Sequence, residues 1–225
     1  AFYGKQWIYS ILHNMGEKTA LGGNLAFFAS DPAAALASPR HGRLVGFGLA
    51  PEGIENNDVV YELLSDVGWS DHAIDLNSWI PTYCMDRYGA DPAAMRKAWI
   101  LLCQTCYANP VYHTRPGYQW TPSLNFHTVD RPDDSAKFHQ AVKLFLKAGD
   151  QLHSSKLYQA DAIELTAQYL GNRVDAALMA AIAADKAGDT KQREHFASAA
   201  LDLMNDMDAL VAHHHHGGMR RIVLH

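Results

Sequence analysis

The sequence predicts an α/β part followed by an all-α part, and three observations support this. Two short apolar segments, residues 7–12 and 43–49, have the length and composition of buried strands, and helical patterns lie between and after them. After Trp69 no further strand pattern occurs. From there on, apolar residues recur at spacings of three and four, as on the buried face of a helix. The first part therefore has the order of a parallel α/β unit, and the second that of a helical bundle.

The elements of the first part can be placed from local signals. The strand at 7–12 leads into His13 and Asn14, and short helices are expected near 24–29 and 33–37, the second capped by Asp31. The strand at 43–49 runs into Pro51 and Glu52. Asn57 is expected to cap a helix over residues 58–66, whose apolar stripe is Val59, Val60, Leu63 and Leu64.

The second part is expected to contain helices only. Their predicted ranges are 76–88, 92–107, 135–149, 155–169, 173–187 and 189–212. Ile163, Ala167 and Leu170 form one predicted buried stripe, and Gly188 lies at a turn between two long antiparallel helices. No 34-residue period recurs, so a tetratricopeptide array is excluded. We expect domains at 1–72 and 73–212, with a tag-like tail at 213–225.

Composition and charge limit the function classes. The chain has 225 residues, 48% of them hydrophobic, and 19 Lys+Arg against 24 Asp+Glu give a net charge of −5. These values are typical of a soluble globular protein and provide no basic surface for nucleic acid or anionic membrane. No run of about 18 apolar residues predicts a membrane span. Three cysteines cannot form a disulfide framework, and they leave the cellular compartment open.

Polar side chains follow both predicted strands. Glu52 comes after a strand whose Gly46 and Gly48 leave room for a ligand near the backbone, and His13 and Asn14 follow the first strand. The carboxyl ends of parallel strands meet at one edge, where barrels and open sheets build their active sites. The sequence therefore predicts a pocket at this edge; the alternative is that Glu52 is an ordinary loop residue.

Three segments resemble the α-N-acetylglucosaminidases, glycoside hydrolase family 89. They are Trp7-Ile-Tyr-Ser-Ile-Leu-His13-Asn14-Met-Gly16, Leu44-Val-Gly-Phe-Gly-Leu-Ala-Pro-Glu52-Gly-Ile54 and Asn57-Asp-Val-Val-Tyr61. The similarity continues through the Arg87-Tyr88-Gly89 turn and covers nearly all of residues 1–212. The resemblance implies the C-terminal part of a (β/α)8 TIM barrel followed by a helical domain, and a secreted, periplasmic or lysosomal location.

The resemblance also implies a retaining exo-glycosidase that removes terminal α-linked N-acetyl-D-glucosamine. Glu52 matches the family's nucleophile, at the end of the seventh barrel strand. Trp7, His13, Asn14, Asn57 and Tyr61 are the implied substrate-binding positions; the alternative for Asn57 and Tyr61 is that they support the Glu52 loop. No metal or other cofactor is implied.

The sequence departs from the family in its acid/base residue. That glutamate belongs to an Asn-Glu pair on an earlier strand, and no such pair occurs among these 225 residues. The first barrel strands are also absent, so we expect a truncated chain that is inactive alone. Its missing barrel half would have to come from the same or another chain.

Other reactive side chains have plainer explanations. Cys103 and Cys106 lie in an apolar helical run without a second cysteine pair, which favours core packing over zinc. The run 213–216 of four histidines is either a tag, a natural turn or a shifted reading frame. His113, His127 and His139 lack the spacing of metal ligands. The segment 109–134 either covers the barrel mouth with its aromatics or packs on the bundle.

One rival comes from a different class. A non-catalytic helical binding or scaffold module, with residues 1–70 as a cap, would leave Glu52 exposed and without a neighbouring pocket.

Overall fold

The computed structural model describes residues 2–13, 20–50, 57–108 and 135–214. The chain begins with a βαβ unit: strand β1 (Gln6–Ile11), helix α1 (Leu25–Ala37) and strand β2 (Arg43–Leu49), after a short turn η1 (Phe2–Gly4). The strands pair in parallel, with Ile8 opposite Gly46 and Ser10 opposite Gly48. Helix α2 (Asp58–Val67) follows β2. The predicted α/β start is confirmed.

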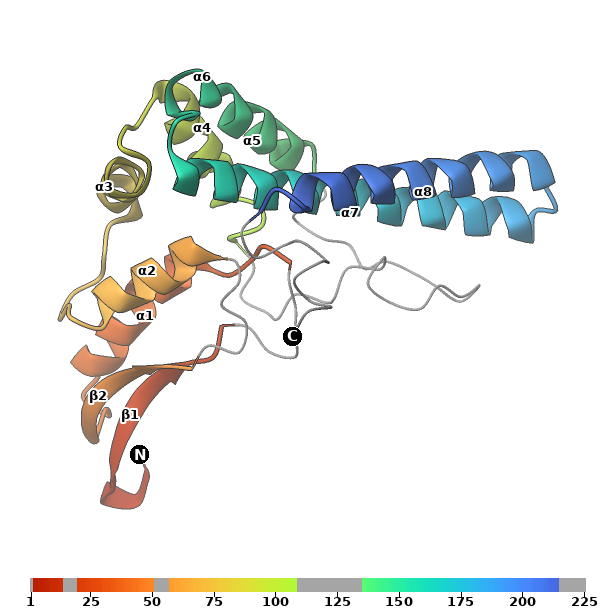
Figure 1. Cartoon of the computed structure of the whole chain (residues 1–225). Helices are drawn as coiled ribbons and strands as arrows, with labels where there is room; N and C mark the ends of the chain where they lie inside the picture. Colours follow the sequence, from red (N-terminus) through yellow and green to blue (C-terminus); the bar gives the residue numbers. More distant parts are fainter. Residues whose placement is uncertain (1, 14–19, 51–56, 109–134, 215–225) are drawn as a thin grey trace, which may run out of the picture.

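Helices α1 and α2 cover one face of the two-stranded sheet (Figure 1). Side chains on that face, such as Ile11 and Phe47, contact the core, whereas Ile8 on the other face is 58% exposed; Val45, at the register shift between the strands, is 57% exposed. Parallel sheets normally bury both faces, because their crossovers place helices on each side. Within the described residues, this sheet has a covered and an uncovered face.

The helix at α1 differs from the prediction of two short helices. It runs without a break through Pro32, and its N-cap is Asn24, whose side chain accepts from the N–H of Phe27. Asp31 therefore caps nothing and instead accepts a hydrogen bond from the Tyr9 hydroxyl. Pro32 is buried one turn after Phe28, and burial of these two side chains offsets the backbone bond that proline cannot make.

The rest of the described chain is helical, as predicted. Its helices are α3 (Leu76–Tyr88), α4 (Ala93–Leu102), α5 (Ala136–Lys147), α6 (Gly149–Leu152), α7 (Lys156–Lys186) and α8 (Thr190–Val211). Side chains of Asp75, Ser135, Ser155 and Asp189 cap α3, α5, α7 and α8 by accepting from free N–H groups of the first turn. Helices α7 and α8 form a long antiparallel hairpin that projects from the body (Figure 1).

Helix α7 corrects a second prediction. A break was expected between residues 169 and 173, but one helix of 31 residues runs through both predicted segments. Gly171 and Asn172 are buried inside it, and the Asn172 side chain bonds to Gln168 one turn earlier. Packing against α8 outweighs the roughly 1 kcal/mol that a glycine costs in a helix interior.

A single apolar core joins the two parts. It runs from Ile11 and Val60 through Tyr83 and Trp99 to Phe145 in α5. Because the same cluster contains side chains of the βαβ unit and of the helices, the helical part supports the strand ends directly. Among the described helices, none combines the length and the apolar character that crossing a membrane requires.

Candidate active site

The residues predicted to form the site differ in where the structure places them. Glu52 and Asn14 lie outside the described residues. His13, just after β1, contacts Tyr61 of α2, and Asn57 bonds to the neighbouring segment 20–23. Trp7 lies at the opposite end of β1, where its indole N–H donates to the carbonyl of His41 at 2.7 Å. The structure therefore brings three of the described candidates together and keeps Trp7 apart.

His13 lies just after β1, and its ring contacts two aromatic rings. Its imidazole meets the ring of Tyr61 edge-on at 5.7 Å between centroids, and that of Phe28 at 5.9 Å. Gly23 lies against the same imidazole at φ +145°, and a Cβ there would stand 3.1 Å from His13 Cε1. This close approach requires glycine. Half-buried His13 is therefore held between α1, α2 and the segment 20–23.

Asn57 occupies the N-cap position of α2 but does not cap it, contrary to the prediction. It is 2% exposed, has a left-handed backbone at φ 64°, and makes no capping bond. Its Oδ1 accepts from the N–H of Gly22 at 2.8 Å, and its Nδ2 donates to the carbonyl of Ala20 at 3.3 Å. Asparagine tolerates this backbone conformation better than most residues. Asn57 thus ties the start of α2 to the segment that follows β1.

A row of buried polar side chains on α7 was missed by the sequence reasoning. Gln168, Asn172 and Asp175 are 4%, 2% and 5% exposed, whereas the predicted stripe of Ile163, Ala167 and Leu170 is only half buried. Their spacing of four and three, continued upstream by Glu164 and Asp161, puts these side chains on one face of the helix. That spacing is visible in the sequence, but the apolar residues Ile163, Ala167 and Leu170 on a neighbouring face predict a different buried stripe.

Gln168 links this row to the strand-end segment. Its Oε1 accepts from the N–H of Leu21 at 3.2 Å, and its Nε2 donates to Asn172 Oδ1 at 3.0 Å. Leu21 is itself 3% exposed. A buried backbone N–H without an acceptor is costly, so this side chain supplies a bond that the local backbone lacks.

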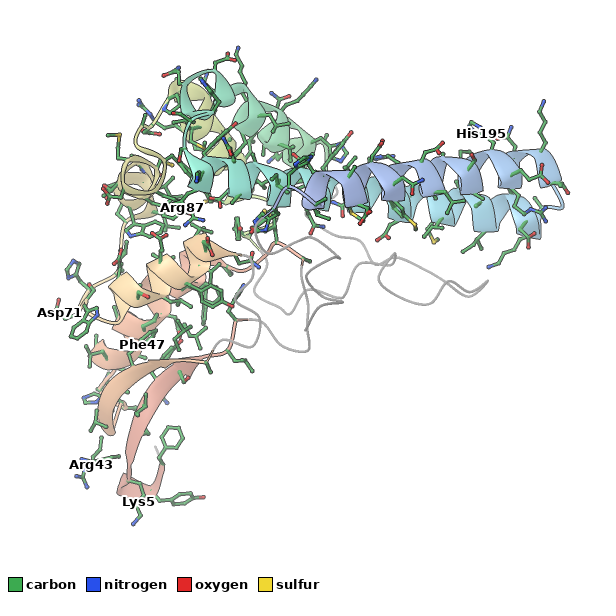
Figure 2. All side chains as sticks on the ribbon, viewed as in Figure 1. Lys5, Arg43, Phe47, Asp71, Arg87 and His195 are labelled. Atoms are coloured by element: carbon green, nitrogen blue, oxygen red, sulfur yellow. The ribbon has the colours of Figure 1, made fainter. Side chains whose placement is uncertain are left out.

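Arg87 forms a second link between the two parts. Figure 2 shows it between α2, α3 and the start of α7, with its side chain only 7% exposed. It donates to Asp161 through Nε at 2.8 Å and Nη2 at 2.7 Å, to Glu62 at 3.2 Å, and to Asp58, the first residue of α2. The Tyr88 hydroxyl also donates to Asp161, at 2.6 Å. Bidentate pairs of this kind are both strong and directional.

The electrostatics of this cluster reflect burial. Burial raises the pKa of the Asp161 carboxyl, and the hydrogen bonds from Arg87 and Tyr88 act against that rise. Burial alone would lower the pKa of Arg87, but the bonds and charge of Asp161 hold it well above its ordinary value. Arg87 is therefore a permanent cation shared by three carboxylates.

A small cavity lies beside the cluster. It measures about 20 Å³ and is lined mainly by apolar and aromatic side chains, together with Asn57, Asp58, Asp161 and Glu164. Burial raises the pKa of Glu164 to about 7, against the effect of His214, whose Nε2 lies 3.3 Å from Oε1. Such a volume holds about one water molecule and is too small for a sugar ring. Glu164 is therefore a buried residue at the junction of the two parts, and the cavity beside it does not hold a sugar.

The remaining candidates carry no site in the described part of the chain. Cys84 and Cys106 are buried and Cys103 is half buried, and none of these three described cysteines is in a disulfide; the burial agrees with the core packing predicted for Cys103 and Cys106. Burial raises the pKa of Cys103 to about 12. Over the described ranges, no three His, Cys, Asp or Glu side chains are arranged to hold a metal ion. His139 packs edge-on against Tyr169, with 5.0 Å between ring centroids. His113, His127 and most of the segment 109–134 lie outside the described residues.

Comparison with known proteins gives two family matches. Residues 1–71 match the alpha-N-acetylglucosaminidase (NAGLU) tim-barrel domain, and residues 79–221 match the alpha-N-acetylglucosaminidase (NAGLU) C-terminal domain. A curated relative, alpha-N-acetylglucosaminidase from Homo sapiens, is 34% identical over 173 residues, which is 75% of this chain and 23% of that protein.

Solved structures agree on the fold. A family 89 glycoside hydrolase from Clostridium perfringens in complex with PUGNAc has a TM-score of 0.81 at 24% identity, over 93% of this chain and 25% of that one. CpGH89 from the same organism, in complex with its substrate GlcNAc-alpha-1,4-galactose, has a TM-score of 0.80 at 23% identity, over 92% and 24%. The chain thus spans about a quarter of the length of these relatives. The predicted order of barrel strands followed by a helical domain is confirmed.

Proposed function

Because this chain belongs to the alpha-N-acetylglucosaminidase family, glycoside hydrolase family 89, we propose that it supplies the nucleophile to a retaining exo-glycosidase. The substrate is a glycan that ends in α-linked N-acetyl-D-glucosamine, in heparan-sulfate-like or other chains. One observation supports the proposal beyond the family match. His13, just after β1, contacts Tyr61, and Asn57 bonds to the segment 20–23 that packs against His13, near the edge at which parallel strands present active-site groups.

In the proposed reaction Glu52 attacks the anomeric carbon. The carboxylate oxygen bonds to that carbon as the bond to the leaving oxygen breaks, and a second carboxylic acid protonates the leaving oxygen. Water, deprotonated by the same second group, then attacks the anomeric carbon, releases Glu52 and restores the original configuration. His13 and Asn14 contact the sugar, while Asn57 and Tyr61 support the residues between β2 and α2.

The second carboxyl is expected to come from outside these 225 residues. Retaining enzymes hold their two carboxyl groups about 5–5.5 Å apart, and the family's acid/base motif is absent from this sequence. The chain by itself is therefore proposed to be inactive towards glycosides. It becomes active once the remaining barrel segments are supplied, in the same or another chain.

The test measures hydrolysis of an aryl α-N-acetylglucosaminide by the chain alone and by the chain mixed with the preceding segments of the Homo sapiens relative. We expect no turnover from the first and clear turnover from the second. Glu52→Gln should lower kcat of the mixture by at least about a thousandfold, because the attacking oxygen is lost. Glu55→Gln, the same change in the same stretch of sequence, is the matched control and should leave kcat within about twofold.

Azide gives a more specific readout of the nucleophile. With Glu52→Ala, azide can occupy the vacated space, attack the anomeric carbon and yield the glycosyl azide of inverted configuration. Formation of that product by Glu52→Ala, but not by Glu55→Ala, would assign the role to Glu52. Turnover that Glu52→Gln leaves intact would overturn the proposal, and a mixture without any turnover would favour the non-catalytic module.

A further inference from the structure

The segment 20–23 is held from two sides by buried side chains. On one side, Gln168 of α7 accepts from the N–H of Leu21 at 3.2 Å, across 147 residues of sequence. On the other, Asn57 accepts from the N–H of Gly22 at 2.8 Å and donates to the carbonyl of Ala20 at 3.3 Å. The segment is therefore the middle of a hydrogen-bonded chain from the helical bundle to the start of α2.

The bundle holds this segment at its far end as well. The N–H of Leu25 donates to the carbonyl of Tyr107 at 3.2 Å, and Asn24 forms an antiparallel bridge with Ala108. Neither Leu21 nor Gly22 belongs to the β1–β2 ladder, so the sheet does not determine where these residues lie. Their backbone groups are buried and depend on Gln168 and Asn57 for hydrogen bonds.

The same segment sets the surroundings of His13. Gly23 is so close to His13, Phe28 and Val60 that a Cβ would stand 3.1 to 3.3 Å from atoms of all three. A shift of the segment by a few tenths of an ångström must therefore move the His13 ring or the faces that pack against it.

We propose that Gln168 is a positioning residue of the candidate active site: from the helical domain, it fixes the segment 20–23, and through it both His13 and Asn57. The role of Gln168 in catalysis rests on the proposed function, whereas its structural coupling to the segment 20–23 does not. Gln168 acts through its Oε1 acceptor, and its bond to Asn172 Oδ1 orients the amide so that this oxygen faces Leu21.

The test uses amide and ring-proton NMR of the whole 225-residue chain. Gln168→Met keeps the length of the side chain and removes the acceptor, whereas Gln168→Glu keeps an acceptor oxygen and loses the donor to Asn172. Gln140→Met makes the first change at an exposed position of α5 and is the matched control.

With Gln168→Met, we expect the signals of Leu21, Gly22, the Asn57 side-chain amide and the His13 ring to shift. Hydrogen exchange at the Leu21 amide should speed up about five- to tenfold, the effect of losing one hydrogen bond. Gln168→Glu should restore the protection of Leu21, and Gln140→Met should change none of these signals. A merely structural role would lower stability without this selective set of shifts, and it would not be rescued by glutamate.

Two results would overturn the proposal: unchanged His13 and Gly22 signals in Gln168→Met, or shifts spread evenly over the bundle. If Gln168→Met does not fold, Gln168→Glu still decides, because the proposal requires a protected Leu21 amide together with a shifted Asn172 side-chain signal. Selective shifts in a chain that shows no Glu52-dependent turnover after mixing would remove the proposed function and leave the positioning intact. Glu52-dependent turnover in a chain whose Gln168→Met variant lacks the selective shifts would overturn the positioning role alone.

Discussion

Replacing Arg87 with methionine removes the cation that Asp58, Glu62 and Asp161 share, and we expect this to destabilise the chain strongly. The Arg87 side chain is 7% exposed and that of Asp161 is 14% exposed, so neither can be solvated freely once its partner is gone. Methionine fills much of the same space, which separates the loss of charge from the loss of volume.

The magnitude follows from burial. Removing one partner of a buried ion pair leaves an uncompensated charge and costs about 3–5 kcal/mol. Asp58 and Glu62 are 42% and 46% exposed, so water screens them and they add little. Asp161 therefore dominates, and Asp161→Asn in the Arg87→Met background should recover about half of the lost stability by removing the buried charge.

The assay is urea unfolding of the 225-residue chain at pH 7, monitored by circular dichroism. Arg193→Met is the matched control, because Arg193 is 43% exposed and its partners Asp185 and Glu194, at 3.3 and 3.5 Å, are 34% and 70% exposed. It should cost no more than about 1 kcal/mol. Equal losses for Arg87→Met and Arg193→Met, or no recovery with Asp161→Asn, would refute the reasoning.

Three further predictions concern single groups. Burial raises the pKa of Glu164 from 4.5 to about 7, so its contribution to stability is complete below pH 4.5 and is lost as the pH rises through 7. Between pH 4.5 and 7, the free energy of unfolding of the wild type, measured in urea, should fall by about 3 kcal/mol relative to that of Glu164→Gln. If the two free energies changed with pH in the same way, the prediction would be wrong. Asn57→Ala should be less stable than Asn57→Gly by about 1 kcal/mol in urea, because alanine resists a φ of 64°; equal stabilities would argue against a strained backbone. Cys103, with its pKa raised to about 12, should react with a disulfide reagent at pH 8 at least about a hundredfold more slowly than in guanidinium, and rapid native labelling would show an open site.

The elements that the sequence predicted well are those set by local chemistry. The strand at 43–49 has the predicted bounds, and α3 matches its predicted range because Asp75 caps it and Gly89 ends it at φ 86°. Where the prediction was wrong, packing overrode a local signal. The predicted breaks before residue 33 and between residues 169 and 173 are absent, and Pro32 and Gly171 lie buried inside continuous helices.

For the candidate site, the sequence by itself determined the family, through the strand-end motifs, and the residue types near each strand end. The order of the parts followed from the apolar patterns, the place of His13 from the rule that parallel strands present their carboxyl ends at one edge, and Tyr61 from the family resemblance. The roles of Glu52 and Asn14 remain predictions from the sequence.

Only the tertiary structure decided which residues hold that site. Gln168 and Leu21 are 147 residues apart in the sequence. Arg87 bonds both to Asp58 and to Asp161, and Asp161 lies 74 residues after Arg87. No periodicity encodes such pairs, because a buried polar group is satisfied by whichever partner the packing brings within reach. Local chemistry thus set the strands and helices, whereas desolvation in the shared core selected the bonds that connect the helical domain to the strand ends.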